Sequence, residues 1–106
     1  MSPGNEDGKG VPQDDQQAAA WYGKAAEQGH PLAQLTLGQD YYFGKGVLKN
    51  DAKAYAWLSI GIAHSDDQQL REAAMPLRDQ LARMLPPDAL TAAQEWTRTW
   101  KPRVAR

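Results

Sequence analysis

The sequence predicts an all-α protein in which about five helices form antiparallel pairs stacked as a short solenoid. The first observation behind this prediction is an internal repeat: Gly8-Lys9-Gly10-Val11 recurs 36 residues later as Gly44-Lys45-Gly46-Val47. A fixed period of this length is typical of repeat proteins. The second observation is that apolar residues recur at helical spacing, while no segment alternates with β-branched residues as a strand would. The repeat continues at the same offset through Asp15 and Asp51, Ala18 and Ala54, Ala20 and Ala56, and Trp21 and Trp57.

Composition excludes several classes of protein. The 106 residues suffice for one domain, and a formal net charge of −1 argues against a nucleic-acid binder that works through bulk charge. The chain has no cysteine, so we expect neither a disulfide framework nor a thiolate zinc site. No apolar run approaches the roughly 18 residues of a membrane span, so no membrane insertion is expected. Residues 1–10 are polar and acidic, unlike a secretory signal, which leaves cytoplasmic and periplasmic locations both open.

A first helix is expected over residues 14–28. The preceding residues 1–13 are rich in Gly, Pro, Asp and Asn and indicate a flexible tail and loop. Asp14 or Asp15 is suited to start the helix, and Gly29 is suited to end it. Its apolar positions at helical spacing are Ala18, Trp21, Tyr22, Ala25 and Ala26.

A second helix is expected over residues 31–43, with Pro31 tolerated in its first turn. Gly38 lies in the middle of this segment, where glycine costs roughly 1 kcal/mol relative to alanine. A glycine at such a position usually permits close contact with another helix, which we expect here. Gly44 and Gly46 end the helix.

Three further helices are expected over residues 51–64, 67–85 and 88–101. Acidic residues at their starts suit both capping and the helix dipole. Pro76 lies inside the fourth predicted helix, where it should kink the helix or remove one hydrogen bond. Residues 102–106 form a basic tail. The acids expected at the three starts are Asp51, Asp66, Asp67 and Asp88.

These residues together resemble the Sel1-like repeat, an α-solenoid relative of the tetratricopeptide repeat. The pattern runs Ala33-x-x-x-Leu37-Gly38-x-x-Tyr41-x-x-Gly44-x-Gly46-Val47 and then Asp51-x-x-Ala54-x-x-Trp57. Residues 8–65 carry it well, whereas residues 66–101 carry it weakly. The residues assigned to the structural repeat signature are Gly8, Gly10, Trp21, Ala33, Leu37, Gly38, Tyr41, Gly44, Gly46, Ala54 and Trp57.

The resemblance implies a right-handed superhelix over residues 14–101: about one full repeat, a partial N-terminal repeat and a degenerate C-terminal capping pair. It also implies a non-catalytic adaptor or scaffold, of the kind found in bacterial systems, that binds a protein or peptide. Trp21 and Trp57 occupy equivalent places and are both expected in the core.

The first helix pair is expected to be incomplete. Leu37 shifted back by one period gives Met1, and the residues around it do not form a repeat helix. The uncovered face of the first predicted helix, including Ala18 and Tyr22, therefore belongs either to a longer solenoid or to a homodimer interface. The latter is part of an alternative hypothesis, in which the chain is a structural spacer or self-association module.

A binding groove is expected on the concave face, which the first helix of each pair lines in superhelical repeats. Leu35, Gln39 and Tyr42 lie on one face of the second predicted helix at spacings of four and three. One period later, the neighbouring helix carries Arg71, Met75 and Arg78. Apolar anchors beside arginines suit a peptide with an apolar side chain and a carboxylate. The alternative is that Leu35, Phe43 or both belong to the core and that the arginines are solvated.

No catalytic, metal or cofactor site is expected. Both glycine-rich turns lack the third glycine of a dinucleotide-binding loop, and neither follows a strand. His30 and His64 are too few for a zinc site, and Ser65 has no oriented base. The sequence therefore predicts a protein that is not an enzyme.

Overall fold

The computed structural model describes residues 13–103 of the protein, and these contain helices and no strands. The all-α prediction is confirmed, and each predicted helix boundary lies within two residues of the observed one. Gly8 and Gly10 lie outside the described residues. The helices are α2 (Gln13–Glu27), α3 (Pro31–Phe43), α4 (Asp51–His64), α5 (Gln68–Met84) and α6 (Pro87–Thr99).

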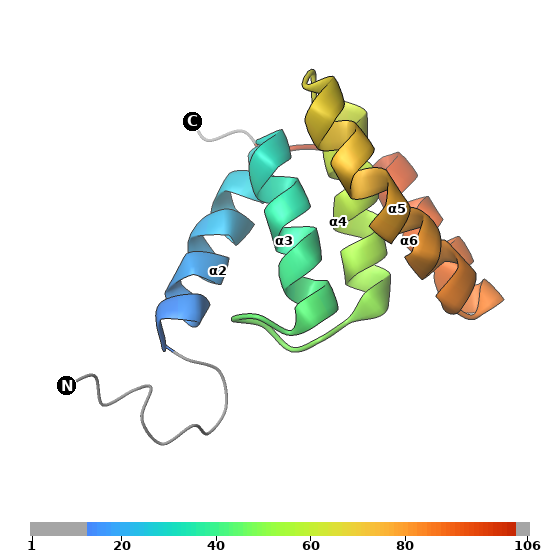
Figure 1. The fold of residues 1–106 in the computed structure, drawn as a ribbon, viewed down its shortest axis with the longest axis horizontal. Helices are drawn as coiled ribbons and strands as arrows, with labels where there is room; N and C mark the ends of the chain where they lie inside the picture. The colour runs from blue at the N-terminus through green and yellow to red at the C-terminus, as the bar shows by residue number, and fades with distance from the viewer. Residues whose placement is uncertain (1–12, 104–106) are drawn as a thin grey trace.

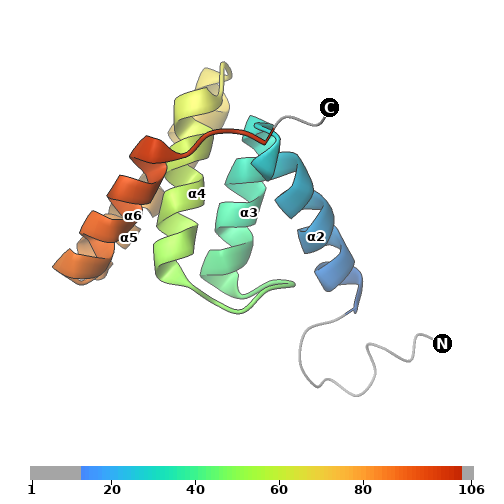
Figure 2. The same ribbon diagram turned by 180° about the vertical axis from the view of Figure 1, so that it is seen from behind.

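The antiparallel pair of α3 and α4 forms the centre of the molecule (Figure 1). Helix α2 packs on α3 at one side, whereas α5 and α6 both pack on α4 at the other side. Seen from behind, α2 and α6 flank the central pair, and the segment after α6 runs back toward the end of α2 (Figure 2). The described part of the chain is therefore one stack of helices.

Two glycines allow α3 and α4 to approach closely. A Cβ at Gly38 would lie 2.8 Å from the Cγ of Leu58 on α4. The contact is reciprocal, because a Cβ at Gly61 of α4 would lie 2.7 Å from a methyl group of Leu35 on α3. Each helix thus offers a glycine to a leucine of the other, and the expected close contact at Gly38 is confirmed.

The turn after α3 joins the central pair to α2. Gly44 has a φ of 72° in the left-handed region, and its N–H donates to the carbonyl oxygen of Asp40. Gly46 has a φ of 78°, and a Cβ there would collide with the carbonyl oxygen of Asp15 and the methyl group of Ala19. Glycine is required at both positions because the conformation disfavours other residues, and at Gly46 also because α2 lies against the turn.

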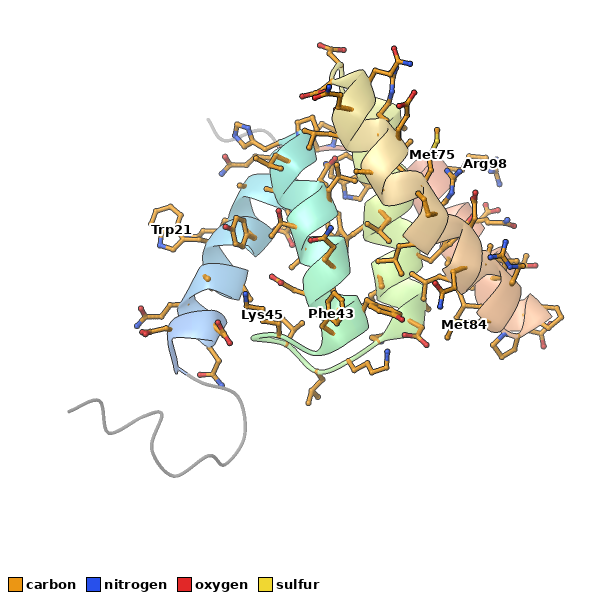
Figure 3. All side chains as sticks on the ribbon, viewed as in Figure 1. Trp21, Phe43, Lys45, Met75, Met84 and Arg98 are labelled. Atoms are coloured by element: carbon orange, nitrogen blue, oxygen red, sulfur yellow. The ribbon has the colours of Figure 1, made fainter. Side chains whose placement is uncertain are left out.

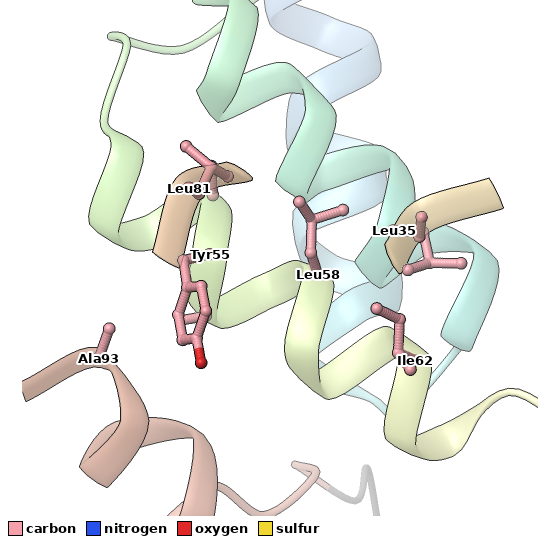
Figure 4. Close-up of a cluster of buried hydrophobic side chains, with 9 residues drawn as sticks. Leu35, Tyr55, Leu58, Ile62, Leu81 and Ala93 are labelled. Carbon is pink, nitrogen blue, oxygen red and sulfur yellow. The ribbon is translucent and has the colours of Figure 1, made fainter. Parts of the chain in front are cut away.

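Two hydrophobic clusters lie on either side of the central pair. One joins Leu35, Leu58 and Ile62 to Ala74 and Leu81 of α5 (Figure 4). The other cluster contains Trp57 and Ile60 of α4, Ala33 and Leu37 of α3, and Ala26 of α2. Beside the second cluster, the buried Gln34 links α3 to α2, because its side-chain amide donates to the carbonyl oxygen of Ala26 at 3.0 Å.

The helix starts differ from prediction at three places. Asn50 rather than Asp51 caps α4, and its side chain accepts the N–H of Lys53 at 2.9 Å. Asp67 caps α5 as predicted. Asp88 lies in the first turn of α6, which begins at Pro87. Asp14 and Asp15 likewise lie in the first turn of α2, whose start is Gln13. The acids still face the positive end of each helix dipole.

The expectation that Trp21 belongs to the core is wrong. Its side chain is 75% exposed, whereas that of Trp57 is 6% exposed. Figure 3 shows Trp21 on the outer side of α2, pointing away from the other helices. The physical reason is that Trp57 packs in one cluster with Ala33 and Leu37 of its own pair partner, α3, while no described helix covers the equivalent face of α2.

We expect Gly38→Ala to lower the free energy of unfolding by about 1–3 kcal/mol, because overpacking against Leu58 exceeds the gain in helix propensity. Gly23→Ala is the matched control, since a Cβ at this helical glycine meets no atom within 4 Å. That change should raise stability by up to about 1 kcal/mol. Denaturant unfolding followed by circular dichroism measures both, and equal stabilisation by the two substitutions would contradict the close contact.

A second prediction about stability concerns the buried Asp40. Burial raises the pKa of its carboxyl above the ordinary value of 3.8, Asp15 acts in the same direction, and Lys45 opposes them. The folded state therefore keeps the proton to higher pH than the unfolded state, so this group lowers stability as pH rises from 3.8 through the raised pKa.

Replacing this carboxyl by an amide, Asp40→Asn, should remove that decline. The difference in free energy of unfolding, wild type minus variant, should decrease as the pH rises from acidic to neutral. Urea unfolding across this pH range measures the difference. Parallel curves for the two proteins, with helix content unchanged, would show that the carboxyl is not destabilised by burial.

Candidate functional site

The prediction that Leu35 lines a binding groove is wrong. Its side chain is only 4% exposed, and it packs against Gly61 in the cluster between α3, α4 and α5. The spacing from Leu35 to Tyr42 correctly places both on one helix face. However, α4 and α5 cover the part of that face around Leu35.

The other two α3 residues of the predicted groove lie nearer the surface. Gln39 is exposed and Tyr42 is half-buried. The ring of Tyr42 packs edge-on against Phe43 at 4.9 Å and lies 4.5 Å below the Lys49 ammonium. That ammonium also donates to the Tyr42 carbonyl at 2.7 Å. Tyr42 is thus engaged by its own chain.

The three predicted residues of α5 do not join them. Arg71 donates to the carbonyl oxygen of Ser65 at 3.2 Å, and Arg78 pairs with Asp79 at 3.0 Å. Met75 is partly exposed, and Figure 3 shows it on the side of α5 away from α3. A residue one period after an α3 residue has the equivalent orientation on α5, so it faces outward from the stack rather than back toward α3. The structure therefore does not assemble the predicted groove.

A different groove lies between the second helices of the pairs. It has a volume of about 590 Å³ and is lined by residues of α4 and α6, together with Tyr41 of α3 and Glu27 of α2. We call it the α4–α6 groove. Much of its wall consists of alanines, which leave space between the helices. Its large side chains are Trp57, Trp96 and Tyr41.

The tryptophans form the aromatic wall of this groove. The rings of Trp57 and Trp96 meet edge to face, with centroids 5.2 Å apart and planes at 80°. Trp57 is buried, but Trp96 is 43% exposed and presents its ring to solvent. Sequence reasoning missed this site because Trp57 and Trp96 are 39 residues apart, so the 36-residue period does not bring them together. The alanines of α6 were the available signal, because small side chains leave space beside a helix.

The segment after α6 lies beside one end of the groove. Trp100 packs edge-on against both Trp57 and His64, at 5.9 and 5.5 Å. Beyond it, the Arg103 N–H donates to the carbonyl oxygen of Glu27 at 2.6 Å. Figure 2 shows this segment crossing from α6 toward the end of α2. We call residues 100–103 the C-terminal strap.

A second exposed surface lies on α2. Gln17, Ala20, Trp21 and Lys24 surround a shallow hollow of about 480 Å³. All four residues belong to the same helix, so this surface is the uncovered face of α2. The sequence predicted an uncovered face on this helix through Ala18 and Tyr22, neither of which lines the hollow, and it assigned Trp21 to the core.

The described residues contain no group of three or more potential metal ligands. Nor does any of their helices have the length and apolarity needed to cross a membrane. What the groove presents is an exposed aromatic ring, small apolar side chains and a charge at either end. Such a surface is chemically suited to contact with another macromolecule.

The fold and this surface define the class: a helical repeat protein that stacks helix pairs. The Sel1 repeat family matches residues 4–30 and 31–66, more than half of the chain, and the chain therefore belongs to the Sel1 repeat family. Comparison with curated proteins gave no match. Sel1 repeats generally serve as protein–protein interaction modules.

A solved structure is also similar to this chain. It is that of a protective antigen present in uropathogenic Escherichia coli strains, which displays an SLR fold. The two share 35% sequence identity and superpose with a TM-score of 0.69 over 89% of this chain. The chain spans only 19% of the length of that antigen.

Proposed function

We propose that this protein is a non-catalytic interaction module whose α4–α6 groove binds a segment of a partner protein. The observation that carries the proposal is Trp96, an exposed tryptophan standing beside a buried one at the edge of an alanine-lined groove. Residues 14–101 form the binding domain, in which α3 and α4 are the complete repeat and α5 and α6 close the stack.

The groove has the features of an interface that binds through a few residues. Tryptophan is enriched among the residues that dominate binding energy, because it offers a large rigid surface. Covering the exposed part of Trp96 removes apolar surface from water, and fully burying a large apolar side chain contributes about 1.5–3 kcal/mol. The alanines of α6 leave room for an apolar side chain or a helix of the partner.

A second candidate function is self-association or a spacer role through α2. The exposure of Trp21 favours it, because an uncovered aromatic ring on a helix face can pack against another chain. In that case the partner would be a second copy of this protein or a neighbouring helix pair.

Site-specific photo-crosslinking separates the two functions. A benzoylphenylalanine replaces Ala92 in the groove or Gln17 on α2, and each protein is irradiated in an extract of the source organism. Adducts with another protein from position 92, but not from position 17, are the expected result. Adducts from position 17 with the mass of a second copy would instead favour self-association.

Trp96→Ala should weaken capture from position 92 by about thirtyfold, as expected when an anchor residue worth about 2 kcal/mol is lost. Trp21→Ala is the matched control, because it removes an exposed tryptophan from the other surface. Circular dichroism verifies that both variants remain helical. An equal loss of capture with both variants would contradict the assignment of the groove as the binding site.

A further inference from the structure

The charged residues of the α4–α6 groove stand at opposite ends of it. Lys53 belongs to the first turn of α4, and Glu27 is the last residue of α2. Glu27 lies at the end beside the C-terminal strap, because its carbonyl oxygen accepts the Arg103 N–H. Figure 2 shows the strap reaching the end of α2. A segment lying along the groove would therefore meet an acid at one end and a base at the other.

The acidic end already receives a basic group from this chain. The guanidinium of Arg103 lies 3.8 Å from the Glu27 carboxylate, and the Arg103 side chain is 82% exposed. An ion pair this open to solvent contributes little stability. The strap itself is held separately, by the Arg103 backbone N–H and by Pro102 against Gly29. The guanidinium can therefore leave Glu27 while the strap stays in place.

Aromatic rings make this end favourable for a cation. Trp96 lines the same groove as Glu27, and a cation over a tryptophan face gains energy beyond its ion pair. The guanidinium group suits such a position because it stacks on rings and pairs with carboxylates.

The basic end has a cation that no carboxylate of the described residues neutralises. The Lys53 ammonium lies 5.4 Å from the centre of the Tyr41 ring, and it makes no ion pair within residues 13–103. The nearby Asp51 pairs instead with Lys49 at 2.8 Å. Lys53 is thus available to an acidic side chain from outside.

Building on the proposed function, we infer that the groove recognises a peptide segment of defined polarity. The segment places an arginine or lysine beside Glu27 and Trp96, a bulky apolar side chain over the alanines, and an aspartate or glutamate beside Lys53. Arg103 occupies the position of the partner's basic side chain in the unbound protein. The C-terminal strap is therefore an internal competitor for that position.

The test selects binders from a random peptide library displayed on phage, with the whole chain as target. Enriched peptides should share a basic and an acidic residue on either side of a bulky apolar one. One such peptide is then synthesised with a fluorescent label, and its affinity is measured by fluorescence polarisation. Absence of peptides enriched above the uncoated surface would overturn the inference.

Charge variants test the mechanism with the same peptide. Glu27→Gln and Lys53→Gln should each weaken binding by about fivefold or more, whereas Arg103→Gln should strengthen it about two- to fivefold by freeing Glu27. Arg98→Gln is the matched control for Arg103, because its guanidinium pairs with Glu95 outside the groove.

The outcomes separate this inference from the proposed function. Binding that is lost with Trp96→Ala but unchanged by the Glu27 and Arg103 substitutions would retain the groove and overturn its charge recognition. Binding that persists with Trp96→Ala would show that the groove is not the peptide site, and would overturn both. An affinity lowered by Arg103→Gln would refute the role of the strap as a competitor.

Discussion

The close contact of α3 and α4 is the constraint on which the rest of the structure depends. Gly38 and Gly61 each cost roughly 1 kcal/mol of helix propensity relative to alanine. The contact offsets this cost because it buries Leu58 and Leu35, and full burial of a leucine contributes about 1.5–3 kcal/mol. With the two helices locked together, α2 can pack on α3 while α5 and α6 pack on α4.

The binding surface follows from how α6 packs on this central pair. Helix α6 meets α4 through Ala93 and through the edge of Trp96 against Trp57, and the small side chains between these contacts leave the groove open. The strap then returns the chain to α2, where Arg103 meets Glu27, the last residue of the first described helix. The first described helix and the segment after the last one therefore meet beside the same groove.

Local sequence signals predict the helices, but they do not predict which residues are buried at the ends of the stack. Asp67 and Gly44 lie where capping and left-handed turns place such residues, and the mid-helix Gly38 indicated a close helix contact. Repeat equivalence failed for Trp21 and for the groove that it predicted between α3 and α5. It gives the orientation of a side chain on its helix, whereas exposure depends on which neighbours that helix has.

The sequence by itself determined the period, the five helices, the glycine turn and the family, because these depend on residues close together in the chain or repeated at one offset. Only the tertiary structure decided where the groove lies. Its aromatic wall joins Trp57 to Trp96, and its acidic end joins Glu27 to Arg103. Neither pair follows the repeat period, so their proximity arises only when α6 and the strap pack against helices that come much earlier in the chain.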